Sequence, residues 1–90
     1  MNPRPIRLRL YGRPDCHLCE EMRREVDELL GDELREWEIL DVDQDPELAR
    51  RYGEVLPVLF VNGRLFARVR LPKLAPRIRL KRAAERTAEE

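Results

Sequence analysis

The sequence predicts a small α/β domain, and three observations point to that class. Residues 6–11 alternate apolar and charged side chains with a period of two, as in a strand that buries one face. Residues 19–30 place apolar side chains at the spacing of one helix face. Asn62-Gly63, between two apolar runs, is a strong hairpin signal. The elements follow in the order strand, helix, strand, helix, strand, strand, helix.

The first strand, Ile6 to Tyr11, is followed by Gly12-Arg13-Pro14-Asp15, a segment in which glycine and proline break the pattern. The helix over Cys19 to Leu30 comes next. We expect Asp15 to act as its N-cap and Gly31 to end it.

The second strand covers Trp37 to Val42. A short helix, Glu47 to Tyr52, follows it, with Asp45 as the N-cap and Pro46 at the first helical position. The continuous apolar run from Val58 to Val61 is typical of a strand buried on both faces.

Asn62-Gly63 turns the chain into a return strand over Arg64 to Val69. The last helix opens near Pro72 or Pro76 and runs through Ala84. We expect its sheet-facing side chains to be Leu74, Ile78 and either Leu80 or the stem of Lys81.

Arg7 and Arg9 lie on the strand face opposite the apolar side chains. They form a basic docking surface, or they pair with Glu36 or Glu38 of a neighbouring strand, or their aliphatic stems cover a partly open sheet. The sequence favours the second and third interpretations.

Composition limits the domain count and the partners. Ninety residues allow one domain, 1–90, and we expect 1–5 and 85–90 to be loose. The 18 basic residues balance the 18 acidic ones, so no net charge favours a nucleic acid or a membrane as partner. No apolar run is long enough to span a bilayer, and we expect a monomer.

Cys16-His17-Leu18-Cys19 holds both cysteines and the single histidine of the chain. Two thiols three residues apart at a helix start lie close enough to form a disulfide. The helix N-terminus stabilises a thiolate on the first of them. No signal peptide is apparent, so we expect a cytoplasmic protein, in which a lone C-x-x-C pair is more often redox-active or metal-binding than structural.

Charge is divided unevenly around this site. Residues 15–54 hold 15 acids and five bases, whereas residues 55–84 hold eight bases and no acid. The two blocks either compensate each other within the fold, which the sequence favours, or leave a basic surface that attracts an anionic thiol or protein.

The chain resembles the glutaredoxin branch of the thioredoxin-fold proteins over nearly its whole length, and in particular a small glutaredoxin-like subfamily. The resemblance lies in the order of elements and in three stretches: residues 11–19 with the C-x-x-C pair, Leu56-Pro57-Val58-Leu59-Phe60-Val61, and Asn62-Gly63. It implies a thioredoxin-like fold with a four-stranded mixed sheet in the order 2-1-3-4, two parallel and two antiparallel neighbours, and three helices. The first and third helices would cover one face and the short second helix the other.

The same resemblance implies a thiol-disulfide oxidoreductase. Cys16 would be the exposed nucleophile, with a pKa below that of an ordinary thiol, and Cys19 the more buried resolving thiol. Pro57 would follow a cis peptide bond and lie against the sulfurs, with the backbone of Leu56 free to pair with a substrate.

Other residues near the motif have two interpretations each. His17 and Arg13 either lower the pKa of Cys16 through their positive charge or are solvated surface side chains. Tyr11 is a wall of the site rather than a catalyst.

Three departures from the glutaredoxin pattern concern the substrate. His17-Leu18 stands between the cysteines, Val55-Leu56 precedes the proline, and Val69-Arg70-Leu71-Pro72 replaces the usual Gly-Gly-x-Asp stretch. The usual glutathione contacts are therefore unmatched, and Arg70 becomes a candidate substrate contact. We expect no bound cofactor, glutathione at most as a co-substrate, a disulfide-bearing protein or small thiol as substrate, and a cellular reductant such as glutathione or a thioredoxin-reductase-like enzyme.

Two other classes of function stay open. A metal or iron-sulfur module would use Cys16 and Cys19, although a closed zinc site needs about four ligands and His17 lies awkwardly between the two cysteines. A redox-silent interaction domain would keep the fold without turnover at the cysteines.

Overall fold

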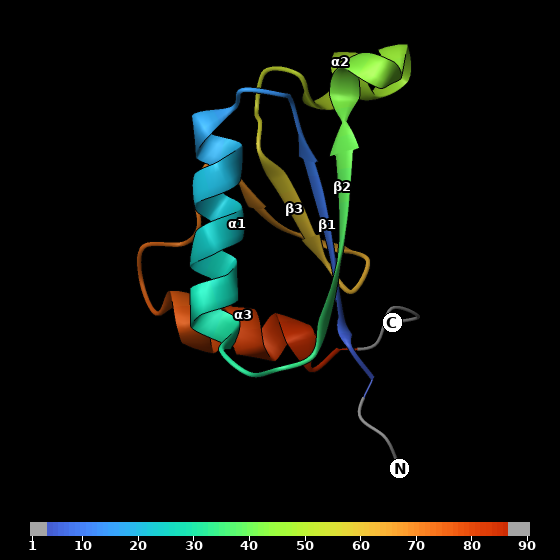
Figure 1. Ribbon diagram of the computed structural model, residues 1–90. Helices are drawn as coiled ribbons and strands as arrows, with labels where there is room; N and C mark the ends of the chain where they lie inside the picture. Colours follow the sequence, from blue (N-terminus) through green and yellow to red (C-terminus); the bar gives the residue numbers. More distant parts are fainter. Residues whose placement is uncertain (1–3, 87–90) are drawn as a thin grey trace.

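The computed structural model describes residues 4–86, which form a four-stranded sheet with helices packed on it (Figure 1). Of the expected loose ends, residues 1–3 and 87–90 lie outside the described part. The strand order is β2-β1-β3-β4, which confirms the expected sheet. The elements are β1 Ile6–Gly12, α1 His17–Leu30, β2 Arg35–Asp41, the 3₁₀-helix η1 Val42–Gln44, α2 Pro46–Tyr52, β3 Val58–Val61, β4 Arg64–Arg68 and α3 Pro76–Ala84.

The sheet is mixed because β1 is parallel to β2 and antiparallel to β3, while β3 and β4 form the antiparallel hairpin at Asn62-Gly63. Four strands have three neighbouring pairs, so one pairing is parallel and two are antiparallel. The expected count of two parallel and two antiparallel neighbours was wrong.

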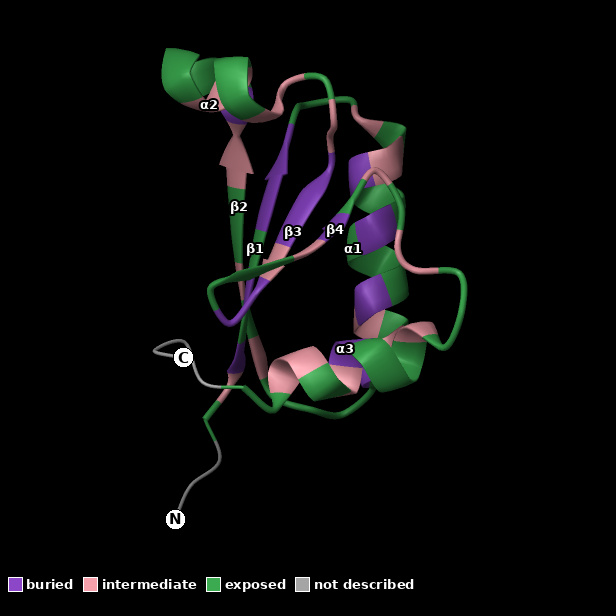
Figure 2. Ribbon diagram, turned by 180° about the vertical axis from the view of Figure 1, so that it is seen from behind, coloured by how far each residue is buried: buried purple, intermediate pink, exposed green. Residues whose placement is uncertain are grey.

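One face of the sheet carries the main hydrophobic core. Leu8 and Leu10 of β1 and Leu59 of β3 belong to this core and are almost fully buried. Buried segments of β1, β3 and α1 are coloured purple in Figure 2. The helices α1 and α3 cover it with one side each, contributing the buried side chains Met22, Val26, Leu30 and Leu80. The expected placement of the first and third helices on one face is confirmed.

The final helix begins at Pro76, and its orientation corrects the sequence prediction. Leu80 is fully buried, but Leu74 and Ile78 are 76% and 55% exposed rather than directed at the sheet. Leu74 precedes the helix, and Ile78 lies two positions from Leu80, which is more than half a turn around an α-helix. A helix that buries Leu80 therefore exposes Ile78.

The opposite face is covered at one end only. There α2 lies beyond the end of β2 (Figure 1) and packs its Leu48 and Tyr52 on a second cluster formed by Tyr11, Val42 and Val58. The remainder of that face is a shallow open hollow of about 460 Å³.

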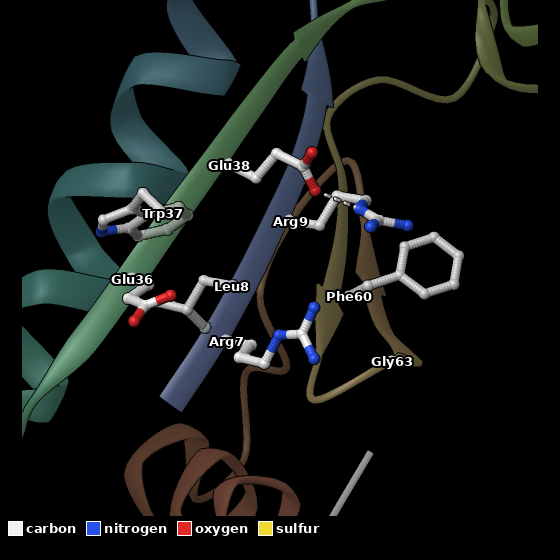
Figure 3. A pocket seen from close by; sticks show the side chains of 8 residues that line it. All are labelled: Arg7, Leu8, Arg9, Glu36, Trp37, Glu38, Phe60 and Gly63. Carbon is white, nitrogen blue, oxygen red and sulfur yellow. Dashed lines mark hydrogen bonds and ion pairs between the residues drawn. The ribbon is translucent and has the colours of Figure 1, made fainter. Parts of the chain in front are cut away.

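Arg7 and Arg9 lie in this hollow, beside Phe60 (Figure 3). The Arg9 guanidinium donates to the Glu38 carboxylate over 2.7 Å, which confirms the predicted pairing across the two strands. This hydrogen bond, with a smaller contribution from the nearby Tyr11, raises the pKa of Arg9 above its ordinary value and outweighs the effect of desolvation. Both arginines are thus part of the uncovered sheet face.

The ends of several elements differ by one or two residues from the prediction. The second strand starts at Arg35 and ends at Asp41, because Val42 turns into η1 and is buried under α2. Asp45 caps α2 through its side chain, as expected. Between residues 4 and 86, no helix combines the length and apolarity needed to cross a bilayer.

Candidate functional site

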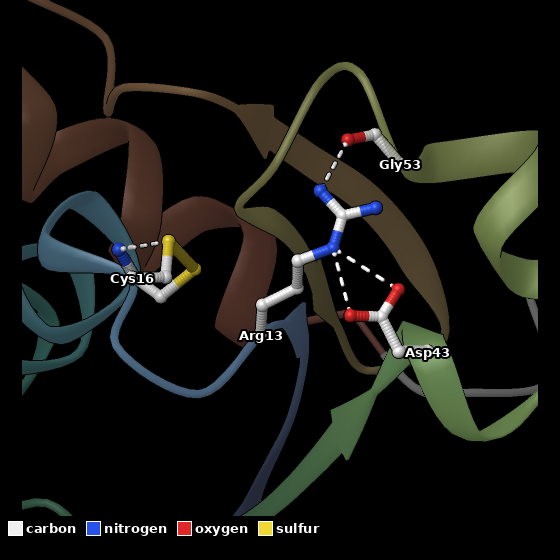
Figure 4. The surroundings of a disulfide bond; sticks show 5 residues. Arg13, Cys16, Asp43 and Gly53 are labelled. Carbon is white, nitrogen blue, oxygen red and sulfur yellow. Dashed lines mark hydrogen bonds and ion pairs between the residues drawn. A yellow bond between two sulfur atoms is a disulfide. The ribbon is translucent and has the colours of Figure 1, made fainter.

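The two cysteines lie at the start of α1, at the end of the sheet where β1 finishes. Cys16 is the N-cap residue and Cys19 lies in the first helical turn, with 5.3 Å between their Cα atoms. This spacing is in the range of native disulfides, and the two sulfurs are joined (Figure 4). The start of α1 therefore holds the two cysteines at disulfide distance.

The two sulfurs differ in exposure and in hydrogen bonding. Cys19 is buried, with 7% of its surface exposed, whereas Cys16 is half-buried. The Cys19 amide donates to Cys16 Sγ over 3.2 Å. Because the first-turn amides have no helical acceptor, they direct partial positive charge at the Cys16 sulfur.

The start of the helix corrects the expected cap. Asp15 was predicted as the N-cap of a helix beginning at Cys19, but α1 begins at His17 and Cys16 itself occupies the cap. Asp15 has a φ of 62°, in the left-handed region that aspartate tolerates better than most residues. Its role is to turn the chain so that the sulfur, rather than a carboxylate, meets the free amides.

Gly12, the last residue of β1, allows Cys19 to sit directly against the strand. A Cβ atom at this position would lie 2.8 Å from Cys19 Sγ and 3.3 Å from Cys19 Cβ. Such a contact is shorter than side chains tolerate, so a glycine is required here for close approach. The sequence analysis treated Gly12 only as a strand breaker; its position directly before the motif was the one available signal.

Pro57 lies at the same end of the sheet as the cysteines, directly before β3. The Leu56-Pro57 bond is cis, as the resemblance implied, and Pro57 is buried. Tyr11 pairs with Val58 in the antiparallel register, which brings Pro57 next to Gly12 at the same end of the sheet. Pro57 therefore lies on the side of the sheet that Cys19 packs against.

The backbone around Pro57 forms only some of its possible hydrogen bonds. The Pro57 carbonyl accepts from the Val69 amide over 2.8 Å, which fastens the segment after β4 to the site. Among residues 4–86, no hydrogen bond involves the amide or carbonyl of Leu56. Arg70, next to Val69, is exposed. The chain thus brings Leu56, Pro57 and Arg70 into one region.

Arg13 and His17, the two basic residues next to the cysteines, differ in their contacts. The Arg13 guanidinium binds the Asp43 carboxylate over 3.1 Å and the Gly53 carbonyl over 3.0 Å. Figure 4 shows this side chain directed away from the disulfide toward those two partners. His17, the first residue of α1, is exposed. Arg13 ties the motif loop to α2 and η1, and its charge is already compensated there.

The Tyr11 side chain lies on the face of the sheet that α2 covers, opposite the face covered by α1 and α3. Its ring is stacked on Tyr52, with 4.7 Å between centroids, and meets Phe60 edge to face. It is 8% exposed and lies under α2. Tyr11 is thus a buried support of the strand that carries the motif.

A groove of about 300 Å³ opens beside the disulfide, between α1 and the end of β2. Its lining is mostly apolar, and Ile39 on its floor is 48% exposed. The sequence analysis missed it, since the groove depends on the β1–β2 register, which no local pattern specifies. Cys16 and Cys19 both line it, together with Leu10, Gly12, Arg13, Pro14, Glu20, Arg23, Ile39, Leu40 and Asp41.

Metal ligands do not gather around the pair in the described part of the chain. Within residues 4–86 no three side chains of His, Cys, Asp or Glu lie together in a way that would hold a metal ion. A metal site at Cys16 and Cys19 would therefore take further ligands from another molecule or from outside this range.

Comparison with known proteins relates the fold and the motif to a family. The family described as "Glutaredoxin-like domain (DUF836)" matches residues 7–84. No curated protein matches the chain.

Two solved structures are similar to it. The solution NMR structure of protein Ne2328 from Nitrosomonas europaea is 35% identical, with a TM-score of 0.66 over 79% of this chain and 88% of that chain. A structure described as that of a malarial protein is 20% identical, with a TM-score of 0.55 over 92% of this chain and all (100%) of that one. The second likeness concerns the fold alone.

Proposed function

The chain belongs to the glutaredoxin-like domain family, and from this we propose that it is a thiol-disulfide oxidoreductase whose Cys16 and Cys19 cycle between dithiol and disulfide. One observation carries the proposal. The half-buried Cys16 caps α1, and its sulfur accepts a hydrogen bond from a backbone amide. The buried Cys19 lies within disulfide distance of that sulfur.

The exchange runs in two displacements. In the reduced protein the Cys16 thiolate attacks one sulfur of a substrate disulfide, so that a Cys16-substrate disulfide forms and the other substrate sulfur leaves as a thiolate. Cys19 then loses its proton and attacks Cys16 Sγ, which releases the second substrate thiolate. The two electrons of the Cys16-Cys19 dithiol have passed to the substrate disulfide, and a thiol reductant restores the dithiol.

The order of attack follows from burial and hydrogen bonding. Cys16 is the more accessible sulfur, and the first-turn amides lower the free energy of its thiolate, so the pKa of its thiol should lie below that of an ordinary cysteine. Cys19, packed on Gly12 and 7% exposed, is the less accessible sulfur and lies within disulfide distance of Cys16. Cys16 is therefore the nucleophile and Cys19 the resolving thiol.

The substrate would lie on the Pro57 side of the motif. There the unbonded amide and carbonyl of Leu56 offer a short backbone pairing edge, Pro57 supplies a rigid wall, and Arg70 supplies a positive charge. Tyr11 supports the wall from behind. His17 is an exposed side chain at the helix start, beside Cys16, whereas Arg13 acts through the loop it holds.

We further propose the setting of this activity. The protein acts as a monomer in the cytoplasm, on a disulfide-bearing protein or a small thiol, and takes electrons from a cellular thiol reductant without a bound cofactor. Glutathione enters at most as a co-substrate, because the residues that usually hold it are replaced by Val69-Arg70-Leu71-Pro72.

The test compares single-cysteine variants of the full chain. Cys16→Ser should lose insulin disulfide reduction and mixed-disulfide reduction entirely, whereas Cys19→Ser should still undergo the first attack. In reduced protein, alkylation of residue 16 should reach half its maximal rate at a pH below the value of about 8.5 for a free thiol. Activity retained in Cys16→Ser would overturn the assignment of the nucleophile. A pair that cellular reductants cannot open would instead indicate a redox-silent domain.

A further inference from the structure

Three basic residues between β4 and the first turn of α3 form no ion pair within residues 4–86. Arg70, Lys73 and Arg77 are exposed, and none of them forms an ion pair with a residue in the range 4–86. Of the bases in residues 55–84, Lys81 pairs with Glu33. The acidic block therefore does not neutralise the segment between β4 and α3.

Two large apolar side chains lie in the same segment. Leu74, 76% exposed, lies just before α3, and Ile78, 55% exposed, lies on the side of α3 that is turned away from the core. The Arg79 side chain donates to the Leu74 carbonyl over 2.8 Å, so this turn has a defined shape. We call Arg70, Lys73, Leu74, Arg77 and Ile78 the basic-apolar strip.

The strip starts at the candidate active site. Its first residue, Arg70, follows Val69, whose amide binds the carbonyl of Pro57. From there the chain leads to the first turn of α3, which packs against α1 on the core side of the sheet (Figure 1). A molecule bound at Pro57 can therefore extend along the strip.

We infer that the basic-apolar strip docks an acidic, leucine-like segment of a disulfide-bearing substrate protein; this inference rests on the proposed function. Cations without an ion pair attract carboxylates. The two exposed apolar side chains would be buried by an apolar residue of a protein segment, which a small anionic thiol does not have. The strip is also a stretch of chain rather than a pocket, which fits an extended segment better than a compact ligand.

The charges near the cysteines indicate where the acidic residues of the substrate should lie. The groove that holds both sulfurs is lined by two acids, Glu20 and Asp41, and by two bases, Arg13 and Arg23, so its charges balance. The cations without an ion pair lie further away along the strip, at Lys73 and Arg77. The substrate should therefore carry its acidic residues several positions away from its cysteine, on one side only.

The experiment uses synthetic peptides that contain one cysteine as a mixed disulfide with 2-mercaptoethanol. The first peptide places glutamates and a leucine several residues from the cysteine, and the second replaces the glutamates by lysines. Reduced full-length protein should react about tenfold faster with the acidic peptide at low salt, and the ratio should shrink at about 0.3 M salt.

Matched variants locate the effect. Lys73→Gln combined with Arg77→Gln should remove most of the preference, whereas Arg4→Gln with Arg24→Gln, an equal change of charge at exposed positions outside the strip, should keep it. Leu74→Ser should slow the acidic peptide about threefold, and Leu34→Ser, at a position 58% exposed, should not. Equal rates for both peptides, or equal effects of strip and control variants, would overturn the inference.

Two further readouts separate this inference from the proposed function. Reaction with 2-hydroxyethyl disulfide reports on the cysteines alone, so its absence would refute the redox proposal. Fluorescence anisotropy of the acidic peptide with serine in place of cysteine reports on docking alone, and tight binding that Lys73→Gln with Arg77→Gln weakens would support the strip. Stronger binding to phosphatidylserine vesicles than to the peptide would assign the strip to a membrane surface and refute a protein substrate.

Discussion

Replacing Gly12 by alanine should disturb Cys19 more than any other part of the molecule. The new Cβ would lie 2.8 Å from Cys19 Sγ, and ordinary contacts begin near 3.4 Å, so the sulfur would have to move by about 0.6 Å. Cys19 is buried between α1 and β1, where neighbouring side chains leave little room. Overpacking of this kind costs about 1–3 kcal/mol of unfolding free energy.

The assay is urea denaturation under reducing conditions, arranged as a double-mutant cycle with Cys19→Ala. Removing the sulfur leaves only the Cys19 Cβ contact at 3.3 Å, so Gly12→Ala should cost at least about 1 kcal/mol less in the Cys19→Ala background. The same cost in both backgrounds would refute the claim that Gly12 is required by the sulfur.

Three other substitutions test the surroundings. Val69 is a β-branched residue with a φ of 64°, in the left-handed region that favours glycine. In thermal unfolding, the Val69→Gly variant should therefore be more stable than the Val69→Ala variant by about 1 kcal/mol. The reverse order would contradict the strain. The Asn62 side chain accepts a hydrogen bond from the Arg7 amide and donates to the carbonyls of Ala84 and Arg86. Asn62→Ala should therefore lower the free energy of unfolding in urea by about 2–3 kcal/mol, and a loss under about 0.5 kcal/mol would count against the stabilising role of these three hydrogen bonds. Desolvation raises the pKa of Asp27, but the hydrogen bonds from Arg35 and Trp37 outweigh it and the net pKa is lowered. That carboxylate, with 42% of its side chain exposed, should therefore contribute up to about 1 kcal/mol above pH 3.8; the stability difference from Asp27→Asn should fade as the pH drops below that value, and a difference that grows in acid would contradict the sign.

Sequence patterns predicted the elements best where the signal is local. Asn62-Gly63 fixes its hairpin because both residues accept positive φ, and Asp45-Pro46 starts α2 through a cap and a preset φ. The strand order came from the resemblance to glutaredoxins, since no local pattern in β1 or β2 specifies which strand lies beside which.

Long-range contacts explain what the sequence did not predict. Arg13 is held by Asp43 and Gly53, which lie 30 and 40 residues further along the chain, so a position beside the motif did not translate into a contact with it. Leu74 and Ile78 were assigned to the sheet-facing side of a helix expected to open near Pro72 or Pro76. The start of α3 at Pro76 decided their exposure, and the same rotation produced the strip.

The cysteine pair itself was predicted as a site, but its detailed geometry was not. The helix start moved from Cys19 to His17, and that shift makes Cys16 the cap whose sulfur accepts the Cys19 amide. The polarity of the pair, one sulfur reachable and one packed on Gly12, follows from this local arrangement.

The most direct measurement of that polarity is a mixed-disulfide trap. Reduced Cys19→Ser and reduced Cys16→Ser are each exposed to the acidic peptide disulfide, and mass spectrometry maps the residue that carries the peptide. Attack by Cys16 followed by resolution at Cys19 predicts a stable adduct on residue 16 in Cys19→Ser and none in Cys16→Ser. An adduct on residue 19 of Cys16→Ser that forms as fast, or no adduct in either variant, would contradict the proposed chemistry.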